Sequence, residues 1–354
     1  MTLNLSAATL DLIYNTTLES FIRDEMFAQA DQDTPTLKVM REKKKTFPGG
    51  EGLKLTGIAS FDYTADWEIF SGEDQLHFNE FNNAKRFTYN GIENHLGMKL
   101  TFTELKAAGF MITDANTKGS MDFKRAAKTD QNKIVDYIET KLKEQDFSAT
   151  QSFSKKRIWS DGSNGFIGVP GIVTQSPSTG VTGGLSRVTN EKWRNRSLVG
   201  ASKINVSATD QTLTQTMRNE MRQLRRYGGK PDFVACGSQA IQAFEKEIQA
   251  KGLYSQTGFK NGKIDIGING ISIVGLPALV YEPALDDLDM ADYFYILDTN
   301  AICLTMLEGD DMQVHLPARP HDKMAGYKSV TWTGMVAAHQ LNSSGVYQID
   351  TADL

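Results

Sequence analysis

The stretch Gly165–Asn195 reads GFIGVPGIVTQSPSTGVTGGLSRVTNEKWRN, and it is the most informative part of the chain. A short apolar run at 166–173 gives way to a loop of Ser, Thr, Gly and Pro. The loop closes on GGLSR at 183–187, and WRN follows at 193–195. Glycines permit tight turns and positive φ angles. We therefore expect a tightly turned, glycine-rich crossover between two parts of the fold.

The glycine-rich loop does not carry a recognisable phosphate-binding motif. It lacks the Lys-Ser/Thr ending of a P-loop and does not match Gly-x-Gly-x-x-Gly. The sequence contains neither an HExxH pair nor a Gly-x-Ser-x-Gly elbow. Its five histidines are scattered, at positions 77, 95, 315, 321 and 339. We therefore predict no catalytic residue, cofactor or metal site, and no enzyme activity.

Two acidic clusters, at 286–292 and 308–311, lack the spacing of an EF-hand. We interpret them as solvated loops, with charge repulsion or pairing between subunits as further possibilities.

Three residues at the end of the opening stretch are candidates for subunit contacts: Arg187, Trp193 and Arg194. Trp and Arg are enriched at protein–protein interfaces, because a flat ring supplies area and a forked cation supplies directional hydrogen bonds. The alternative is that Trp193 is a core residue and that the arginines are surface charges. The residue types by themselves leave both interpretations open.

Length and composition indicate an ordinary globular protein. The chain has 354 residues, enough for two domains, with 40% hydrophobic and 23% charged residues. Its net charge of −5 argues against a dedicated sequence-specific DNA binder, which would carry a basic excess. Cys236 and Cys303 lie in apolar runs and should be small buried residues in a reducing cytoplasm. The N-terminal residues do not resemble a signal peptide, and no apolar run is long enough to span a membrane.

The N-terminal segment predicts an amphipathic helix over about 6–29, with Leu10, Tyr14 and Phe21 on its apolar stripe. This stripe packs either on its own domain or, as an arm, on a neighbouring subunit. Lys43, Lys44 and Lys45 follow in a polar stretch. They are either simply solvated or in non-specific contact with backbone phosphates of DNA.

Residues 51–108 are strand-rich and unusually polar, with the clearest strands in GLKLTGIASFDY, KRFTYNGI and GMKLTFTEL. Between them lies FSGEDQLHFNEFNNAKR, which includes Phe78 and Phe81 but little else that builds a core. The pattern predicts a long hairpin. An isolated hairpin is only marginally stable, so we expect this one to lie on another surface. In an oligomer that surface can be an adjacent chain, which makes both phenylalanines interface candidates.

The remainder alternates helices and strands. The Gly- and Pro-free run 120–161 predicts a long helix over about 121–150. An α/β region follows, with helices at about 210–228 and 238–252 and strands at 233–236, 271–274 and 279–281. The final stretch, 293–348, is again strand-rich.

The opening stretch resembles the major capsid proteins of tailed bacteriophages. In that family a Gly-Leu-x-x-Ile-Val element precedes Gly-Gly-x-x-Arg and then Trp-Arg. Here GVPGIV at 168–173 departs from the first element, whereas Gly183, Gly184, Arg187, Trp193 and Arg194 match the other two. The order of parts along the chain is also that of the family.

The resemblance implies an α+β protein with the Hong Kong 97-type capsid fold. The expected parts are an N-terminal arm at 1–47, an extended E-loop hairpin at 48–97, a peripheral (P) domain at 98–168 and 300–354 containing the spine helix, and an axial (A) domain at 169–299.

The resemblance also implies a structural function. Copies of the chain would assemble in the host cytoplasm as pentamers and hexamers, and close into an icosahedral phage head around double-stranded DNA. Expected partners are a separate scaffolding protein and a portal, with no membrane and no covalent cross-linking between subunits. Whether a decoration protein also attaches stays open. Two alternatives stay open, namely an encapsulin-type nanocompartment shell with enzyme cargo and a soluble two-domain enzyme.

Overall fold

The computed structural model describes most of the chain outside its N-terminal and spine-helix segments. The described residues are 32–49, 52–61, 67–72, 83–101, 147–206, 212–250, 277–315 and 325–351, with short strands at 259–260 and 263–264 and a few isolated positions. The chain divides into two compact units. Unit 1 comprises residues 1–32, 93–151 and 310–332, and unit 2 comprises residues 33–92, 152–309 and 333–354.

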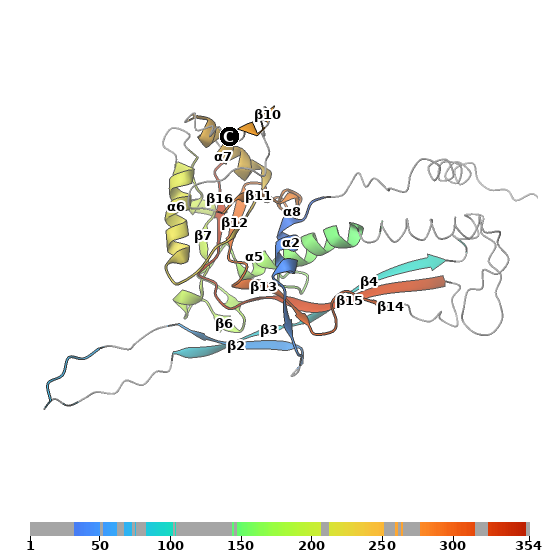
Figure 1. Ribbon diagram of the computed structural model, residues 1–354, viewed down its shortest axis with the longest axis horizontal. Helices are drawn as coiled ribbons and strands as arrows, with labels where there is room; N and C mark the ends of the chain where they lie inside the picture. The colour runs from blue at the N-terminus through green and yellow to red at the C-terminus, as the bar shows by residue number, and fades with distance from the viewer. Residues whose placement is uncertain are drawn as a thin grey trace, which may run out of the picture. The chain divides into compact units, whose positions relative to one another are not determined.

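A five-stranded sheet with the order β11-β8-β12-β16-β7 organises unit 2 (Figure 1). The β11–β8 and β16–β7 pairs are parallel, whereas β12 is antiparallel to both β8 and β16. Every residue of β8 is buried, so side chains cover both faces of the sheet at its centre. The strands are β7 (Arg196–Leu198), β8 (Phe233–Cys236), β11 (Leu279–Tyr281), β12 (Tyr293–Leu297) and β16 (Gly345–Gln348).

Two helices, α6 (Thr212–Arg225) and α7 (Ser238–Ala250), share one apolar core with this sheet. In α6, Leu213, Met217, Met221 and Leu224 recur every three or four residues and therefore lie on one helix face. All four are buried. Gly228 follows the helix with φ of 85°, a left-handed conformation that commonly ends helices. The predicted helices and the strand between them are confirmed.

A second sheet is built around β15 (Ala325–Ala338), the longest described strand, whose first residues belong to unit 1 and whose last residues belong to unit 2. In unit 2, β15 pairs antiparallel with β13 (Ile302–Leu307), which in turn pairs parallel with β1 (Lys45–Phe47). In unit 1, β14 (Gln313–His315) and β4 (Ile92–Thr101) pair with β15. The strand-rich C-terminal stretch is therefore confirmed.

The predicted hairpin is present as β2 (Lys54–Ser60) and β3 (Ala84–Asn90). These strands pair antiparallel from Lys54 opposite Asn90 to Ser60 opposite Ala84. Phe87 and Tyr89, two residues apart on β3, are both buried. Side chains two residues apart on a strand share a face, so this face of the hairpin base packs against the rest of unit 2.

The described end of the predicted long helix runs past residue 150. Residues 147–153 are α-helical and continue into a π-helical turn, η1 (Ser154–Ile158). Gly168, just before the short helix α5 (Val169–Ile172), lies against this turn. A Cβ atom at Gly168 would lie 2.3 Å from the Arg157 carbonyl oxygen and 2.4 Å from that of Ile158. Only glycine fits this close approach of two backbones.

The last part of the predicted N-terminal arm is integrated into unit 2. In α2 (Pro35–Glu42), Leu37 and Met40 are 1% exposed, and the Thr36 backbone N–H donates to Glu282 Oε2 at 3.0 Å. Burial raises the pKa of Glu282 above its ordinary value, and hydrogen bonds from Thr36 partly oppose that shift. Residues 33–47 therefore belong to unit 2, and the predicted domain boundaries stay predictions.

Within the described part of the chain, no helix combines the length and the apolar composition needed to cross a membrane. Cys236 and Cys303 are buried free thiols, as their apolar surroundings predicted.

Candidate functional site at the base of the long hairpin

The glycine-rich crossover contains a minimal hairpin of two-residue strands, β5 (Val181–Thr182) and β6 (Leu185–Ser186). Gly183 and Gly184 form the turn, with φ of 59° and 76°. Two positive φ values in succession are typical of a type I′ turn, whose twist matches that of paired strands. The expectation of tight turns with positive φ is confirmed here. The turn directs Arg187 back into the protein.

Arg187 is the centre of a buried hydrogen-bond network, with a side chain only 1% exposed. Its Nε donates to Thr182 Oγ1 at 2.8 Å, and its Nη1 donates to Thr174 Oγ1 at 2.8 Å and to Asn195 Oδ1 at 2.7 Å. Its Nη2 donates to the Ile172 carbonyl oxygen. Burial lowers the pKa of Arg187 from its ordinary value, but arginine stays protonated in proteins.

Asn195 shares this network and closes the crossover. Its Oδ1 accepts from Arg187 and from the Thr174 backbone N–H at 3.2 Å, while its Nδ2 donates to the Thr174 carbonyl oxygen at 2.8 Å. The start of the crossover is thereby tied to its end, across twenty intervening residues. A buried network with these groups satisfied fixes one loop conformation.

Trp193 joins the crossover to the long hairpin. It ends the 3₁₀ turn η2 (Glu191–Trp193), is 2% exposed, and donates from Nε1 to the Thr182 carbonyl oxygen at 3.0 Å. Its ring stacks on Phe87 of β3, with centroids 5.5 Å apart and planes 27° apart. Phe61, which follows β2, meets the same indole edge-on at 5.6 Å. Both sides of the hairpin base therefore rest on one tryptophan.

Two glycines make room for the aromatic residues of β3. A Cβ atom at Gly57, which pairs with Phe87 across the hairpin, would lie 2.2 Å from Phe87 Cζ. A Cβ atom at Gly183 would lie 3.1 Å from Tyr89 Cζ. The Thr88 backbone N–H also donates to the Gly183 carbonyl oxygen at 2.8 Å. The hairpin and the crossover thus fit together through glycine and aromatic side chains.

Polar contacts complete this anchor. Lys85 Nζ donates to Asn190 Oδ1 at 2.7 Å, and the ammonium lies 5.9 Å from the centroid of the Phe61 ring. Arg194 Nε donates to the Arg187 carbonyl oxygen at 2.6 Å, and its Nη2 donates to the Val188 carbonyl oxygen at 2.8 Å. We call the Arg187 network and the Trp193–Phe87–Phe61 cluster together the hairpin anchor.

The interface candidates Arg187 and Trp193 are thus occupied by contacts within one chain. A side chain that is 1–2% exposed in the single chain has almost no surface left to present to a neighbour. Trp193 and Arg187 are therefore buried within the single chain, and an effect of these two residues on subunit contacts stays a prediction. The Arg194 side chain is 26% exposed, and its Nη1 lies 3.8 Å from Glu191 Oε1. The other interface candidates lie outside the described residues: Leu10, Tyr14, Phe21, Phe78 and Phe81.

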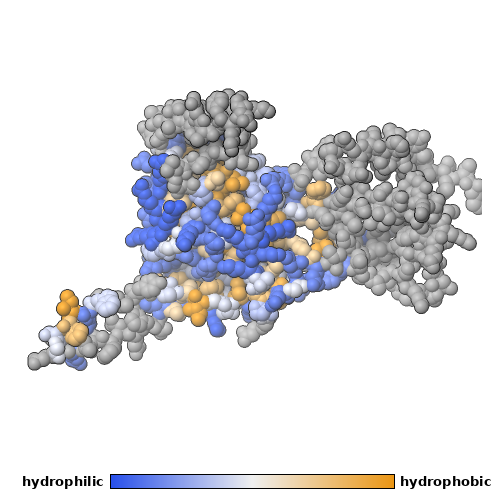
Figure 2. Space-filling view, in the orientation of Figure 1, coloured by the Kyte–Doolittle hydropathy of each residue, from blue (hydrophilic) through white to orange (hydrophobic). Residues whose placement is uncertain are grey.

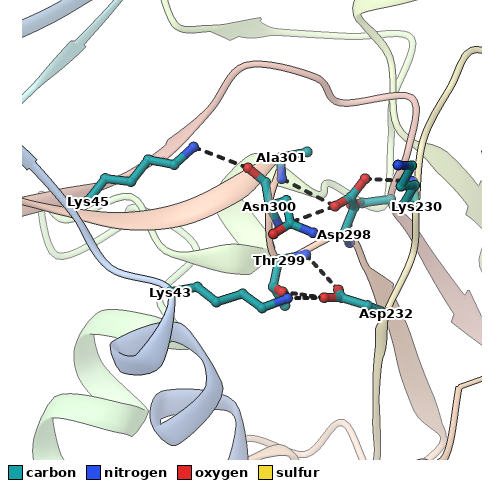
Figure 3. A network of polar contacts seen from close by, with 9 residues as sticks. Lys43, Lys45, Lys230, Asp232, Asp298, Thr299, Asn300 and Ala301 are labelled. Carbon is teal, nitrogen blue, oxygen red and sulfur yellow. Dashed lines mark hydrogen bonds and ion pairs between the residues drawn. The ribbon is translucent and has the colours of Figure 1, made fainter.

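Two of the three DNA-facing candidates hold β1 to neighbouring turns (Figure 3). Lys43 pairs with Asp232, whose carboxylate also accepts from the Thr299 backbone N–H at 2.9 Å. Lys45 Nζ donates to the Asn300 carbonyl oxygen at 3.3 Å. Lys44 is exposed. A DNA contact by these lysines stays a prediction, and Lys43 is available for one only by breaking its ion pair.

Sequence reasoning missed the hairpin side of the anchor. Phe61, Phe87 and Lys85 come from strands more than 100 residues before Trp193. The stretch KRFTYNGI predicted a strand, but nothing in the sequence indicated which face of it is buried or what that face contacts. Gly57 opposite an aromatic residue was the one available signal, because glycine in a strand often marks a close approach.

The hairpin also carries apolar side chains that the anchor does not use. Trp67, Ile69 and Phe70 are 97%, 101% and 62% exposed. Figure 2 shows hydrophobic surface at the lower left. We call Trp67, Ile69 and Phe70 the hairpin tip. Exposed apolar groups of this size mark interaction sites in soluble proteins.

The described residues contain no cluster of three or more His, Cys, Asp or Glu side chains that could hold a metal ion. Burial in the core is the main cause of the raised pKa values of Tyr295 and Cys236.

No family model and no curated protein matches the sequence. Among solved structures, a chain of the cyanophage A-1(L) capsid asymmetric unit is similar, with a TM-score of 0.60 and 13% identity over 93% of this chain and 96% of that one. A chain of Microbacterium phage Oxtober96 has a TM-score of 0.50 and 10% identity over 93% and 95%. A chain of the holo-SrpI encapsulin complex from Synechococcus elongatus has a TM-score of 0.49 and 10% identity over 95% and 96%.

Proposed function

We propose that this chain, which has the Hong Kong 97-type fold of phage capsid proteins, is the major capsid protein of a tailed bacteriophage. In this proposal, copies of the chain assemble as pentamers and hexamers and close into an icosahedral head around double-stranded DNA. The likeness to the cyanophage capsid chain supports it, because the two chains correspond over nearly their whole lengths.

The observation that carries the proposal is the contrast between the two ends of the long hairpin. Its base is fixed by the buried hairpin anchor, whereas its tip exposes Trp67, Ile69 and Phe70. Fully burying one such side chain contributes roughly 1.5–3 kcal/mol. A neighbouring subunit would bury the tip, and many such contacts in a shell reinforce one another.

The partners belong to the same proposal. We infer a scaffolding protein and a portal, with assembly in the host cytoplasm and a final location in the virion. The net charge of −5 suits a shell that contacts DNA non-specifically and does not attract it strongly.

Negative-stain electron microscopy of the purified protein, with light scattering for mass, tests the proposal. Closed shells, or rings of five and six, are expected. Co-purifying DNA or a portal complex would identify a phage head, whereas a co-purifying enzyme would identify an encapsulin-type compartment. A uniform monomer or dimer at high concentration, with a scaffolding protein supplied, would contradict a shell function.

A further inference from the structure

Four exposed arginines lie within nine residues at the end of α6: Arg218, Arg222 and Arg225 of the helix, and Arg226, which follows it. We call them the arginine row. The spacing of four and three residues between Arg218, Arg222 and Arg225 places these three on one side of the helix, away from the buried leucines and methionines. Hydrophilic side chains gather over α6 in Figure 2. The described contacts of the row are a hydrogen bond from Arg222 Nη1 to Asn219 Oδ1 at 3.3 Å and the stacking of Arg226 on Tyr227.

Neither the chain's composition nor the helix itself explains the row. The chain is acidic overall, so four neighbouring cations without an ion pair to a described residue are a local exception. The helix dipole favours cations near a C-terminus, and Arg222 and Arg225 lie in the last turn. Arg218 lies one turn earlier, where this effect has faded.

An acidic turn lies elsewhere in the same unit. Residues 286–289, after α8 (Pro283–Asp286), include Asp286, Asp287 and Asp289. Lys155 pairs with Asp287, which leaves the turn with a net negative charge. Asp289 is exposed.

The arginine row and the acidic turn belong to opposite edges of the five-stranded sheet. Glu220 of α6 binds Arg196 of β7 through Oε1 at 2.7 Å and Oε2 at 2.9 Å, which fixes the helix to the β7 edge. The acidic turn follows β11, the strand at the other edge. Figure 1 shows α6 and α8 on opposite sides of this sheet.

We propose that the arginine row of one chain contacts the acidic turn of a second copy within a capsomer ring. This inference rests on the proposed function and specifies one of its interfaces. Different, complementary patches on two sides of one unit make a head-to-tail contact, and such contacts close into rings when the rotation between copies allows it. A contact through one self-complementary patch would instead stop at a dimer.

Charge in this contact sets orientation and association rate more than affinity. Exposed ion pairs are individually weak, but like charges brought together at an interface are strongly unfavourable. Reversing the charge of one patch is therefore a sharper test than neutralising it. Nucleic acid is the competing occupant, since arginine also binds phosphate.

The experiment uses the full-length chain and two variants with opposite changes. The row variant combines Arg218→Glu with Arg222→Glu, and the turn variant combines Leu288→Lys with Asp289→Lys. All four side chains are exposed in the single chain. Lys54→Glu with Lys156→Glu is the control matched to the row variant, because it makes the same change in net charge at exposed positions outside α6. Circular dichroism confirms folding, and native mass spectrometry with electron microscopy reports ring size.

We expect the wild type and the control to form rings, and each variant alone to lose at least nine-tenths of them. A chain with all four changes should recover rings. An equimolar mixture of the two variants should form even-membered rings only, because the variants must alternate. Rings formed by either variant alone, or no recovery in the four-site chain, would overturn the contact.

DNA mobility-shift assays at the same salt concentration test whether the arginine row binds nucleic acid instead of a second copy of the chain. A row variant that loses DNA binding but keeps its rings would show that the row binds phosphate, and would overturn the proposal. A wild type that never leaves the monomer contradicts the shell function and the contact together. A wild type that assembles alongside unaffected variants contradicts the contact alone.

Discussion

Arg187 is a buried cation whose described hydrogen-bond acceptors are all neutral oxygens, supplied by Ile172, Thr174, Thr182 and Asn195. The planar guanidinium group donates to these acceptors in several directions at once, which the ammonium group of a lysine on its flexible side chain does not. The arginine therefore acts through geometry more than through charge pairing. It holds the start, turn and end of the glycine-rich crossover together.

We expect Arg187→Met to lower the free energy of unfolding by about 2 kcal/mol or more, because buried acceptors would lose their donors. Denaturant unfolding measures this. Arg187→Lys keeps the charge but not the fork, and should be destabilised to a similar extent. A lysine variant as stable as the wild type would show that the charge is what matters.

Gly168 illustrates a second residue-level requirement, the absence of a side chain. A Cβ atom there would lie within 2.4 Å of two carbonyl oxygens of the π-helical turn. We expect Gly168→Ala to lower the free energy of unfolding by about 1–3 kcal/mol, since backbone must shift to accept the methyl group. Gly72, whose Cβ would meet nothing within 4 Å, is the control, and Gly72→Ala should change the thermal midpoint little.

At the scale of elements, the long hairpin depends on the fit between Gly57, Phe87 and Trp193. Gly57→Ala should displace the Phe87 ring from the indole and loosen the hairpin base. Hydrogen exchange is expected to accelerate in β2 and β3 by about tenfold, equivalent to roughly 1.4 kcal/mol, while β8 and β12 stay protected. Thr56→Ala, at an exposed neighbouring position on β2, should leave exchange unchanged. Equal acceleration in both variants would contradict the fit.

The attachment of α2 and β1 should depend on pH through Asp232. Burial acts to raise the pKa of this carboxyl, but hydrogen bonds from Lys43 and Thr299 outweigh it and hold the pKa below its ordinary value. A lowered pKa contributes stability above the unfolded-state value of about 3.9 and loses it as pH falls through the folded value. Stability from this network is therefore present at neutral pH and is lost in acid.

We expect Asp232→Asn to lower the free energy of unfolding by about 1 kcal/mol or less at pH 7. The thermal midpoint of the variant should also depend less on pH between pH 5 and pH 2. The magnitude is small because the Lys43 and Asp232 side chains are 37% and 32% exposed. Asp33→Asn, which removes the more exposed pair with Lys38, is the control. Identical pH profiles for the wild type and Asp232→Asn would rule out this linkage.

At the scale of the whole molecule, the hairpin tip should be needed for assembly and not for folding. Trp67→Ser with Ile69→Ser removes two side chains that are almost fully exposed in the single chain, so the thermal midpoint of the monomer should change little. Assembly measured by light scattering should fall at least tenfold. Ile58→Thr, a 74% exposed position on β2, is the control for general loss of apolar surface. Normal shells from the tip variant would contradict its role.

The element pattern was largely predictable because it depends on local periodicity. The stripe Leu213, Met217, Met221 and Leu224 indicated α6, and the apolar run at 233–236 indicated β8. The end of the spine helix was less accurate, because helix formers thin out after residue 150 while the chain still turns helically to Ile158. The polar composition of residues 33–47 did not indicate the burial of Leu37 and Met40.

The sequence by itself determined the order of the main helices and strands in the described part of the chain, the glycine turn at 183–184 and the resemblance of the crossover to phage capsid proteins, since all three follow from residues near one another in the chain. Only the tertiary structure decided that Trp193 is an internal support for the hairpin and that Arg187 binds neutral oxygens inside the crossover. It also decided that the arginine row and the acidic turn lie at opposite edges of one sheet. These relations join residues that are far apart in the sequence. Packing and strand order bring such residues together, and local periodicity encodes neither of them.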